Sequence, residues 1–186
     1  MGGGPAVMRL FFALPLPPQA LEEMERLQKG LPGPARLPRR ESLHLTLAFL
    51  GETDPARLPA ARRALFALEP PALDLGFSRL GSFPQKGGFL WWLGADPCPE
   101  LAALEKELRS LLEKEGFPLE RRPFLPHVTL ARRVPVPAPQ GASLPRPIRA
   151  RCDRVCLLRS HLGPGGSRYE ELICQPAKNP LSRFPG

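Results

Sequence analysis

His44-Leu45-Thr46-Leu47 and His127-Val128-Thr129-Leu130 are two copies of one pattern: histidine, aliphatic residue, threonine, leucine. In an extended strand successive side chains point to opposite faces, so the histidine and threonine of each copy share a face, about 6.6 Å apart along the strand. The aliphatic residues between and after them point the other way, into a core. Each copy therefore presents an imidazole and a hydroxyl on an open face of a strand anchored from behind.

Two of the three histidines in the chain occupy these matched positions. A single strand of this pattern arises by chance in many proteins, and a lone histidine in it is more often a surface or core residue than a catalyst. The repetition indicates a site with paired imidazoles. Because histidine titrates near neutral pH, two of them in one cleft can act as general acid and general base at once. The pattern therefore predicts phosphoryl chemistry that needs no metal.

With both patterns present, the chain resembles the 2H phosphoesterases, specifically the bacterial and archaeal RNA 2′,3′-cyclic phosphodiesterases, also called 2′-5′ RNA ligases. The resemblance runs from Met8 to about Leu172. It is carried by residues 8–14, 41–51, 80–84 and 122–132. It implies an α+β fold of two lobes related by a pseudo-twofold axis, in which two antiparallel sheets face a central cleft and helices pack outside. Periodicity alone predicts only mixed helices and strands.

Apolar periodicity and turn signals divide the chain into alternating elements. Besides the two histidine strands, we expect strands at residues 8–14, 73–83, 89–95, 148–160 and 168–175, and helices at residues 19–31, from 54 to about 68, and 99–115. A loop rich in proline and arginine covers residues 32–40, a proline-rich linker residues 134–147, and a glycine-rich turn residues 163–166.

The length of 186 residues fits one domain or two closely joined lobes. We expect residues 1–7 to be a flexible leader, residues 8–175 to form a single bilobal domain, and residues 176–186 to be an irregular tail.

The formal charge of +8 makes a polyanion a natural partner, although many basic proteins bind none. No export signal is recognisable, and no apolar run approaches the roughly 20 residues that cross a bilayer. We therefore expect a soluble cytoplasmic monomer that binds RNA and no membrane. The four cysteines are not spaced as a CxxC pair and have no histidine close by, so the expectation is free buried thiols, with no metal and no cofactor.

By the resemblance, the substrate is an RNA with a 2′,3′-cyclic phosphate end and the product carries a 2′-phosphate. His44 is then the proton donor and His127 the acceptor that activates water, although the residues alone leave the two roles interchangeable. Thr46 and Thr129 would bind the phosphate oxygens through their hydroxyls. Their presence is also compatible with the ordinary preference of β-branched residues for strands.

Arg132 stands at the arginine position of the family pattern and would stabilise charge on the phosphate. Strict alternation places it on the face opposite His127, so only a bulge or the strand end would bring it round, and Arg133 is the alternative. The matching position in the first copy is Phe49. We expect His161 to be a solvated loop residue.

Other functions remain open. The same residues would serve ATP-independent joining of 2′,3′-cyclic phosphate and 5′-hydroxyl ends into a 2′-5′ bond. A non-catalytic RNA-binding module is a further alternative, against which the intact histidines and threonines argue. A metal hydrolase is weaker, since two histidines without a nearby carboxylate make a poor ligand set.

Overall fold

The computed structural model describes residues 7–164 and 166–178, so most of the expected leader and tail lies outside the described residues. The strands are β1 Met8–Pro15, β2 His44–Thr53, β3 Leu73–Gln85, β4 Gly88–Ala95, β5 His127–Val134, β6 Ser143–Cys152, β7 Arg154–Gly163 and β8 Gly166–Pro176. The helices are α1 Pro18–Lys29, α2 Leu58–Ala67 and α3 Pro99–Lys114. No helix in the described part of the chain is long and apolar enough to cross a membrane.

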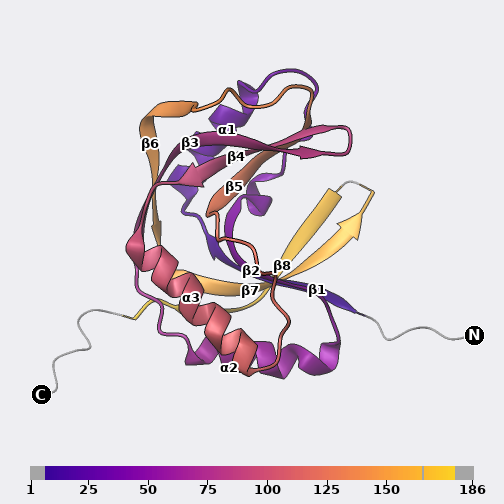
Figure 1. Ribbon diagram of the computed structural model, residues 1–186, viewed down its shortest axis with the longest axis vertical. Helices are drawn as coiled ribbons and strands as arrows, with labels where there is room; N and C mark the ends of the chain where they lie inside the picture. The colour runs from indigo at the N-terminus through magenta and orange to yellow at the C-terminus, as the bar shows by residue number, and fades with distance from the viewer. Residues whose placement is uncertain (1–6, 165, 179–186) are drawn as a thin grey trace, which may run out of the picture.

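The strands form two four-stranded antiparallel sheets, in the orders β2-β1-β7-β8 and β5-β4-β3-β6. Each histidine strand lies at the edge of its sheet, and the unit β1-α1-β2 of the first half corresponds to β4-α3-β5 of the second. Figure 1 shows β2 and β5 near the middle of the molecule, where the edges of the two sheets meet. The expected α+β fold with two antiparallel sheets is confirmed.

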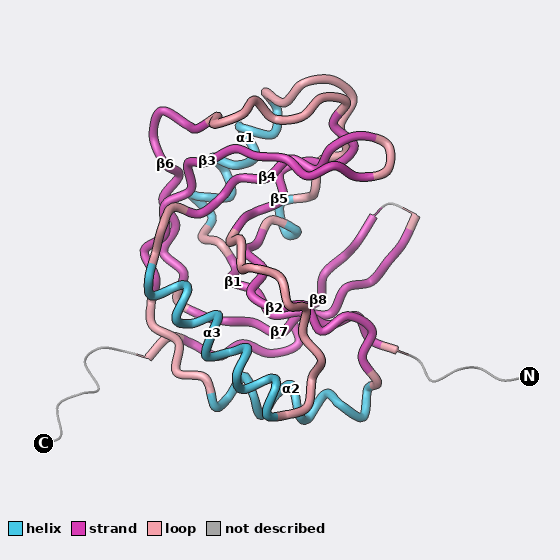
Figure 2. The backbone as a smooth tube through the Cα atoms, viewed as in Figure 1, coloured by secondary structure: helices cyan, strands magenta, loops and turns pink. Residues whose placement is uncertain are grey.

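The helices cover the outer sides of this arrangement. Helix α1 contacts β5 and β6, whereas α2 contacts β7, β8 and α3, and α3 also contacts β2. Figure 2 shows α1 at one end of the molecule and α2 with α3 at the other. The apolar stripe of α3 causes its packing, because Leu101, Leu104 and Leu108 fall on one helical face and are all buried. The helix stops before Gly116, whose φ of +79° favours glycine.

One hydrophobic core joins the two sheets and the helices. It includes Phe12 and Leu45 from the first sheet and Phe77, Leu93 and Val128 from the second, each 0% exposed. Burial of such a side chain contributes about 1.5–3 kcal/mol. The aliphatic positions of both histidine patterns belong to this core, so the histidine strands are anchored from behind as the sequence predicts.

The expected single strand at residues 148–160 is wrong. Strand β6 ends at Cys152 and pairs with β3, whereas β7 starts at Arg154 and pairs with β1 in the other sheet. The chain changes sheets at Asp153, and a continuous apolar alternation does not reveal such a corner. Strand β6 also begins earlier than expected and includes Pro145 and Pro147, which an edge strand tolerates because one side of its backbone needs no hydrogen bonds.

The expectation of four free cysteines is also wrong. Cys156 and Cys174 form a disulfide, while Cys98 and Cys152 are free. The bonded residues are opposite each other in β7 and β8, with their Cα atoms 4.1 Å apart. Strand register decides this pairing, and the spacing of the cysteines in the sequence does not show it.

Candidate active site

The two histidine strands meet at one cavity. Strands β2 and β5 contact each other, and a cavity of about 850 Å³ lies beside them. All five residues predicted for the site line this cavity: His44, Thr46, His127, Thr129 and Arg132. Residues from the two halves of the sequence therefore share one space, and each histidine is the first residue of its strand.

A β-bulge brings Arg132 into the cavity. In β5, Thr129 and Ala131 are opposite neighbouring residues of β4, so Leu130 is an extra residue. Leu130 and Ala131 are consequently both buried. The bulge shifts the alternation of side chains by one residue, and Arg132 then shares the face of His127. The sequence analysis expected that a bulge or the strand end would be needed, because Arg132 lies an odd number of residues after His127.

Strand β2 has the equivalent bulge at Leu47. Thr46 and Ala48 are opposite neighbouring residues of β1, and Leu47 and Ala48 are both buried. Phe49 therefore reaches the cavity at the position that Arg132 takes in β5. The two halves of the site share their backbone geometry, and the arginine is present in one half.

A backbone carbonyl orients the ring of His127. Its Nδ1 lies 2.7 Å from the carbonyl oxygen of Leu125. Because a carbonyl only accepts, Nδ1 carries the hydrogen, and Nε2 of the neutral ring is left as an acceptor. Burial lowers the pKa of His127, the charge of Arg132 lowers it further, and the Leu125 carbonyl acts in the opposite direction.

The pKa of His44 is lowered more. Burial, followed by the charges of His127 and Arg132, lowers the pKa of His44 from 6.5 to about 4. Its Nδ1 is buried and makes no hydrogen bond of normal geometry with the described residues, although the nearby backbone of Ser42 opposes the shift. In the free protein the pKa of each ring therefore lies below the ordinary 6.5 of an imidazole. An anion between these groups would favour the charged forms.

Aromatic rings pack beside each imidazole. The ring of His44 lies 5.0 Å from those of Phe11 and Tyr169. The ring of His127 lies 5.7 Å from Phe83 and 6.0 Å from Trp92. These neighbours help to bury the histidines, and burial is the main cause of the lowering of their pKa values. The sequence gives no signal for them, since they come from four different strands that only the sheet topology brings together.

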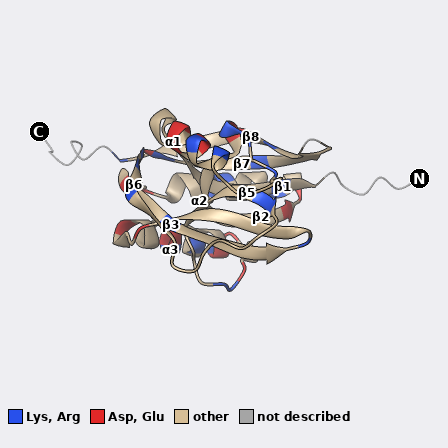
Figure 3. Ribbon diagram, turned by 90° about the horizontal axis from the view of Figure 1, so that it is seen from above, with Lys and Arg blue, Asp and Glu red and all other residues tan. Residues whose placement is uncertain are grey.

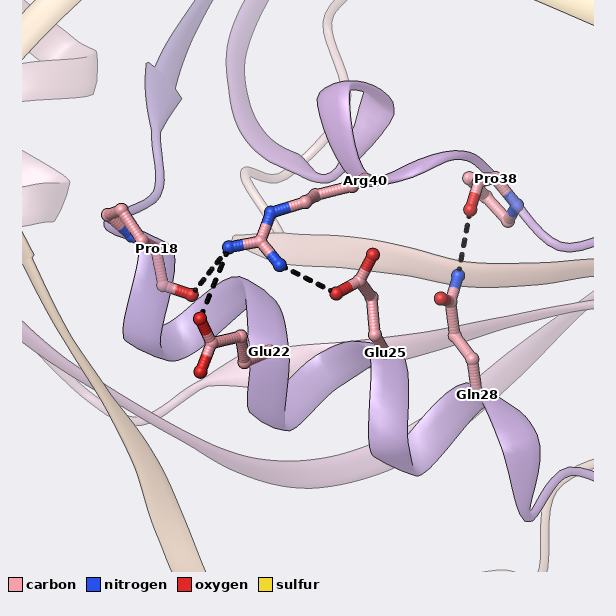
Figure 4. A network of polar contacts seen from close by, with 6 residues as sticks. All are labelled: Pro18, Glu22, Glu25, Gln28, Pro38 and Arg40. Carbon is pink, nitrogen blue, oxygen red and sulfur yellow. Dashed lines mark hydrogen bonds and ion pairs between the residues drawn. The ribbon is translucent and has the colours of Figure 1, made fainter.

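Gln28 is a further residue that the sequence analysis missed. Its side chain is 6% exposed, and its Nε2 donates to the carbonyl of Leu130 at 2.9 Å and to that of Pro38 at 3.1 Å. It thereby joins α1 to the bulge of β5. Through Pro38 it also joins α1 to the loop after that helix (Figure 4). The only signal was a polar residue four positions after Met24, on the buried stripe of the helix.

The same loop is fixed to α1 by Arg40. Its Nη1 donates to Glu25 at 2.8 Å, and its Nη2 donates to the carbonyl of Pro18 at 3.1 Å (Figure 4). Two side chains, Gln28 and Arg40, thus hold the loop of residues 30–39 against the helix. This loop brings Arg36 and Arg39 to the cavity.

The cavity is basic. Besides Arg132, it is lined by Arg9, Arg36, Arg39 and Arg168, and none of its lining residues, all of which are described, is acidic. Figure 3 shows basic segments beside the labels of β1, β2 and β5. A site of this charge favours a phosphate ligand.

His161 and Glu170 lie across the β7–β8 hairpin, with Nε2 of the histidine 2.7 Å from the carboxylate. His161 is exposed as expected, but it belongs to β7 and not to a loop. In the described residues, the only cluster of three ligand-type side chains close enough to share a metal ion is Cys156, Glu171 and Cys174. Two of its members form the disulfide, so they offer no thiolates.

Comparisons with known proteins agree with this geometry. A profile of the 2′-5′ RNA ligase superfamily matches residues 16–164. An RNA 2′,3′-cyclic phosphodiesterase from Thermotoga maritima is 32% identical over 181 residues, covering 90% of this chain and 95% of the relative. One from Thermus thermophilus is 34% identical over 177 residues, covering 89% and 88%. Among solved structures, Escherichia coli LigT complexed with 3′-AMP superposes with a TM-score of 0.82 at 27% identity, covering 94% of this chain and 100% of that chain.

Proposed function

The chain belongs to the 2′-5′ RNA ligase superfamily, and from this premise we propose that it is an RNA 2′,3′-cyclic phosphodiesterase that opens the cyclic end to a 2′-phosphomonoester. The observation that carries the proposal is the meeting of two matched histidine strands at one basic cavity. Both histidines come from one chain, which supports a monomer as the active unit. A cytoplasmic location stays a prediction from the sequence.

The two imidazoles would move two protons in opposite directions. Nε2 of His127 accepts a proton from water as the water oxygen bonds to phosphorus. The bond between phosphorus and the 3′ oxygen breaks, and His44 donates a proton to that oxygen. The phosphate stays on the 2′ oxygen. The Leu125 carbonyl supports the acceptor role, because it leaves Nε2 of His127 free to accept.

The donor role requires a proton on His44, whose pKa in the free protein is about 4. The negative charge of the bound phosphate raises this pKa, since it offsets the positive charges of Arg132 and His127. In the free protein, burial and the neighbouring positive charges disfavour the charged form of His44. The roles therefore follow from the family resemblance, and the pH profiles of the two variants decide which histidine is the donor.

We assign the phosphate oxygens to Thr46, Thr129 and Arg132. Each threonine lies two residues after its histidine on the same face, and the bulge adds Arg132 to that face. Arg132 offers a planar fork that matches two phosphate oxygens.

The test is hydrolysis of a short RNA that ends in a 2′,3′-cyclic phosphate, with identification of the product end. We expect a 2′-phosphate, and we expect His44→Ala and His127→Ala each to lower turnover by about 10²- to 10⁴-fold. Arg62→Ala is the control, because this exposed arginine of α2 does not line the cavity. A folded variant of His44 or His127 with near-complete activity would contradict the two-histidine mechanism.

Joining of RNA ends is a second candidate, because the matching family profile describes 2′-5′ RNA ligases. A 5′-hydroxyl would then replace water in the same cavity. Incubation with an RNA that carries a 5′-hydroxyl, without ATP, measures this reaction beside hydrolysis. Binding of RNA without either product would indicate the non-catalytic alternative.

A further inference from the structure

Arg36 and Arg132 are direct cross-strand neighbours, although almost a hundred residues separate them. The amide of Arg36 donates to the carbonyl of Arg132 at 2.8 Å, and the amide of Arg132 donates to the carbonyl of Arg36 at 2.9 Å. Residues that exchange both hydrogen bonds are opposite each other in an antiparallel pair, and their side chains share a face. The loop after α1 therefore places a second guanidinium beside the arginine that we assign to the cyclic phosphate.

Two like charges at directly opposite positions destabilise a strand pair. Within the described part of the chain, neither Arg36 nor Arg132 forms an ion pair, and no acidic residue lines their cavity. By contrast, the neighbouring Arg40 is paired with Glu25. The two arginines thus lack the carboxylates that offset charge elsewhere on the loop, and anions between or beside them would remove the repulsion.

The Arg36 side chain reaches across the cavity to the β7–β8 hairpin. Its guanidinium fills the space that a Cβ would take at Gly166. Arg168, on the same hairpin, and Arg39, on the same loop as Arg36, also line the cavity. Gln28 and Arg40 hold this loop on α1, so Arg36 is presented from a fixed backbone. The positive charge therefore continues from Arg132 outward along one side of the cavity.

We propose that Arg36, with Arg39 and Arg168 beside it, binds the backbone phosphate that precedes the cyclic phosphate in an RNA strand. The preferred substrate is then an RNA chain end and not a cyclic mononucleotide, which has no second phosphate for Arg36. The inference rests on the proposed hydrolysis, and it further specifies that the substrate is longer than one nucleotide. Arginine suits this position because its fork can donate two hydrogen bonds to one phosphate.

The experiment compares kcat/KM for two substrates, adenosine 2′,3′-cyclic phosphate and a short RNA with a 2′,3′-cyclic phosphate end. We expect Arg36→Ala to lower the value for the RNA by about 10- to 100-fold, the effect of one lost charged hydrogen bond. For the mononucleotide, kcat/KM should change less than about 2-fold, because this substrate has no second phosphate for Arg36 to bind. For the RNA, the slope of log kcat/KM against the log of the salt concentration should become shallower by about 0.7.

Two variants serve as controls. Arg36→Lys keeps the charge and should keep the salt dependence while losing part of the RNA preference, because lysine has no fork. Arg62→Ala removes an exposed arginine from α2 and should leave kcat/KM unchanged for both substrates. Arg36 is exposed, so its replacement should leave the fold intact, which a thermal melt checks.

An equal loss on both substrates, or no loss on RNA, would overturn the inference. In either case the wild-type protein still hydrolyses the cyclic ends, and the proposed function stands. If the wild type hydrolyses neither substrate, the proposed function itself fails. The two failures are therefore distinguishable in one set of measurements.

Discussion

At the scale of single residues, the site consists of two histidines in similar but unequal surroundings. Both are half-buried beside aromatic rings, and this burial lowers the pKa of both. His127 has a carbonyl partner for Nδ1, whereas Nδ1 of His44 has no hydrogen bond of normal geometry among the described residues. Near-identical sequence patterns thus give two imidazoles of different basicity, which suits one proton acceptor and one donor.

This inequality predicts the pH dependence of hydrolysis. The acceptor must be neutral and the donor must be charged, so the rate falls at low pH, where the acceptor is protonated, and at high pH, where the donor has lost its proton. Because both pKa values lie below 6.5 in the free protein, the bell-shaped profile of kcat/KM should have its maximum below pH 6.5. The profile of kcat should lie at higher pH, since bound phosphate raises both values.

The variants then separate the roles. With His44 as donor, His44→Ala should flatten the fall at high pH, and His127→Ala should flatten the fall at low pH. The measurement is rate against pH for both variants. If His44→Ala instead flattens the fall at low pH and His127→Ala the fall at high pH, the donor and acceptor roles must be exchanged, and the site stands. A wild-type rate that does not depend on pH would contradict acid–base catalysis by this pair.

At the scale of elements, the bulges of β2 and β5 decide which side chains enter the cavity. Each bulge inserts one leucine, and the residue two positions later joins the face of the histidine. In β5 this residue is Arg132, and the carbonyl of the inserted Leu130 accepts a hydrogen bond from Gln28. A helix side chain therefore stabilises the irregularity on which the position of the arginine depends.

Replacement of Gln28 tests this dependence. Gln28→Leu leaves the carbonyls of Leu130 and Pro38 without their partner, so we expect a loss of about 1–3 kcal/mol in unfolding free energy. We also expect kcat to fall by about 10-fold, because a small displacement of the phosphate ligands is costly. In an Arg132→Ala background the same replacement should lower kcat much less.

The matched control is Gln175→Leu, which removes a glutamine amide that donates to the Leu68 carbonyl away from the cavity. Chemical denaturation and steady-state kinetics provide both readouts. If Gln28→Leu lowers kcat equally with and without Arg132, then Gln28 does not act through the position of Arg132.

At the scale of the whole molecule, two sheets of similar construction share one core. Phe12 of the first sheet and Phe77 of the second are both 0% exposed and belong to the same cluster. The lobes therefore cannot unfold separately without exposing the faces that each buries against the other. The two halves contribute to one buried cluster, and we expect them to behave as one cooperative unit.

We accordingly predict a single unfolding transition. Phe12→Ala and Phe77→Ala should each lower the unfolding free energy by about 3–5 kcal/mol through loss of buried area and formation of a cavity. Phe66→Ala, on the exposed side of α2, should cost about 0.5 kcal/mol. Urea unfolding followed by tryptophan fluorescence, which reports the second sheet, and by circular dichroism should give coincident curves. Two separate transitions would contradict the shared core.

The sequence by itself determined which residues we propose for the chemistry, and it predicted most of the elements. Local side-chain alternation places His44 beside Thr46 and His127 beside Thr129, and local periodicity predicts α3 and the strands β1 and β4. These features depend on residues within a few positions of one another, which is why a linear pattern reveals them. The family resemblance added the two facing sheets.

Only the tertiary structure decided what depends on register and on contacts between distant segments. The bulge that turns Arg132 inward exists in the pairing of β5 with β4, and the disulfide exists in the pairing of β7 with β8. The corner at Asp153 and the neighbouring positions of Arg36 and Arg132 likewise join segments far apart in the chain. A one-residue change of register reverses the face of every side chain, and no local pattern fixes that register.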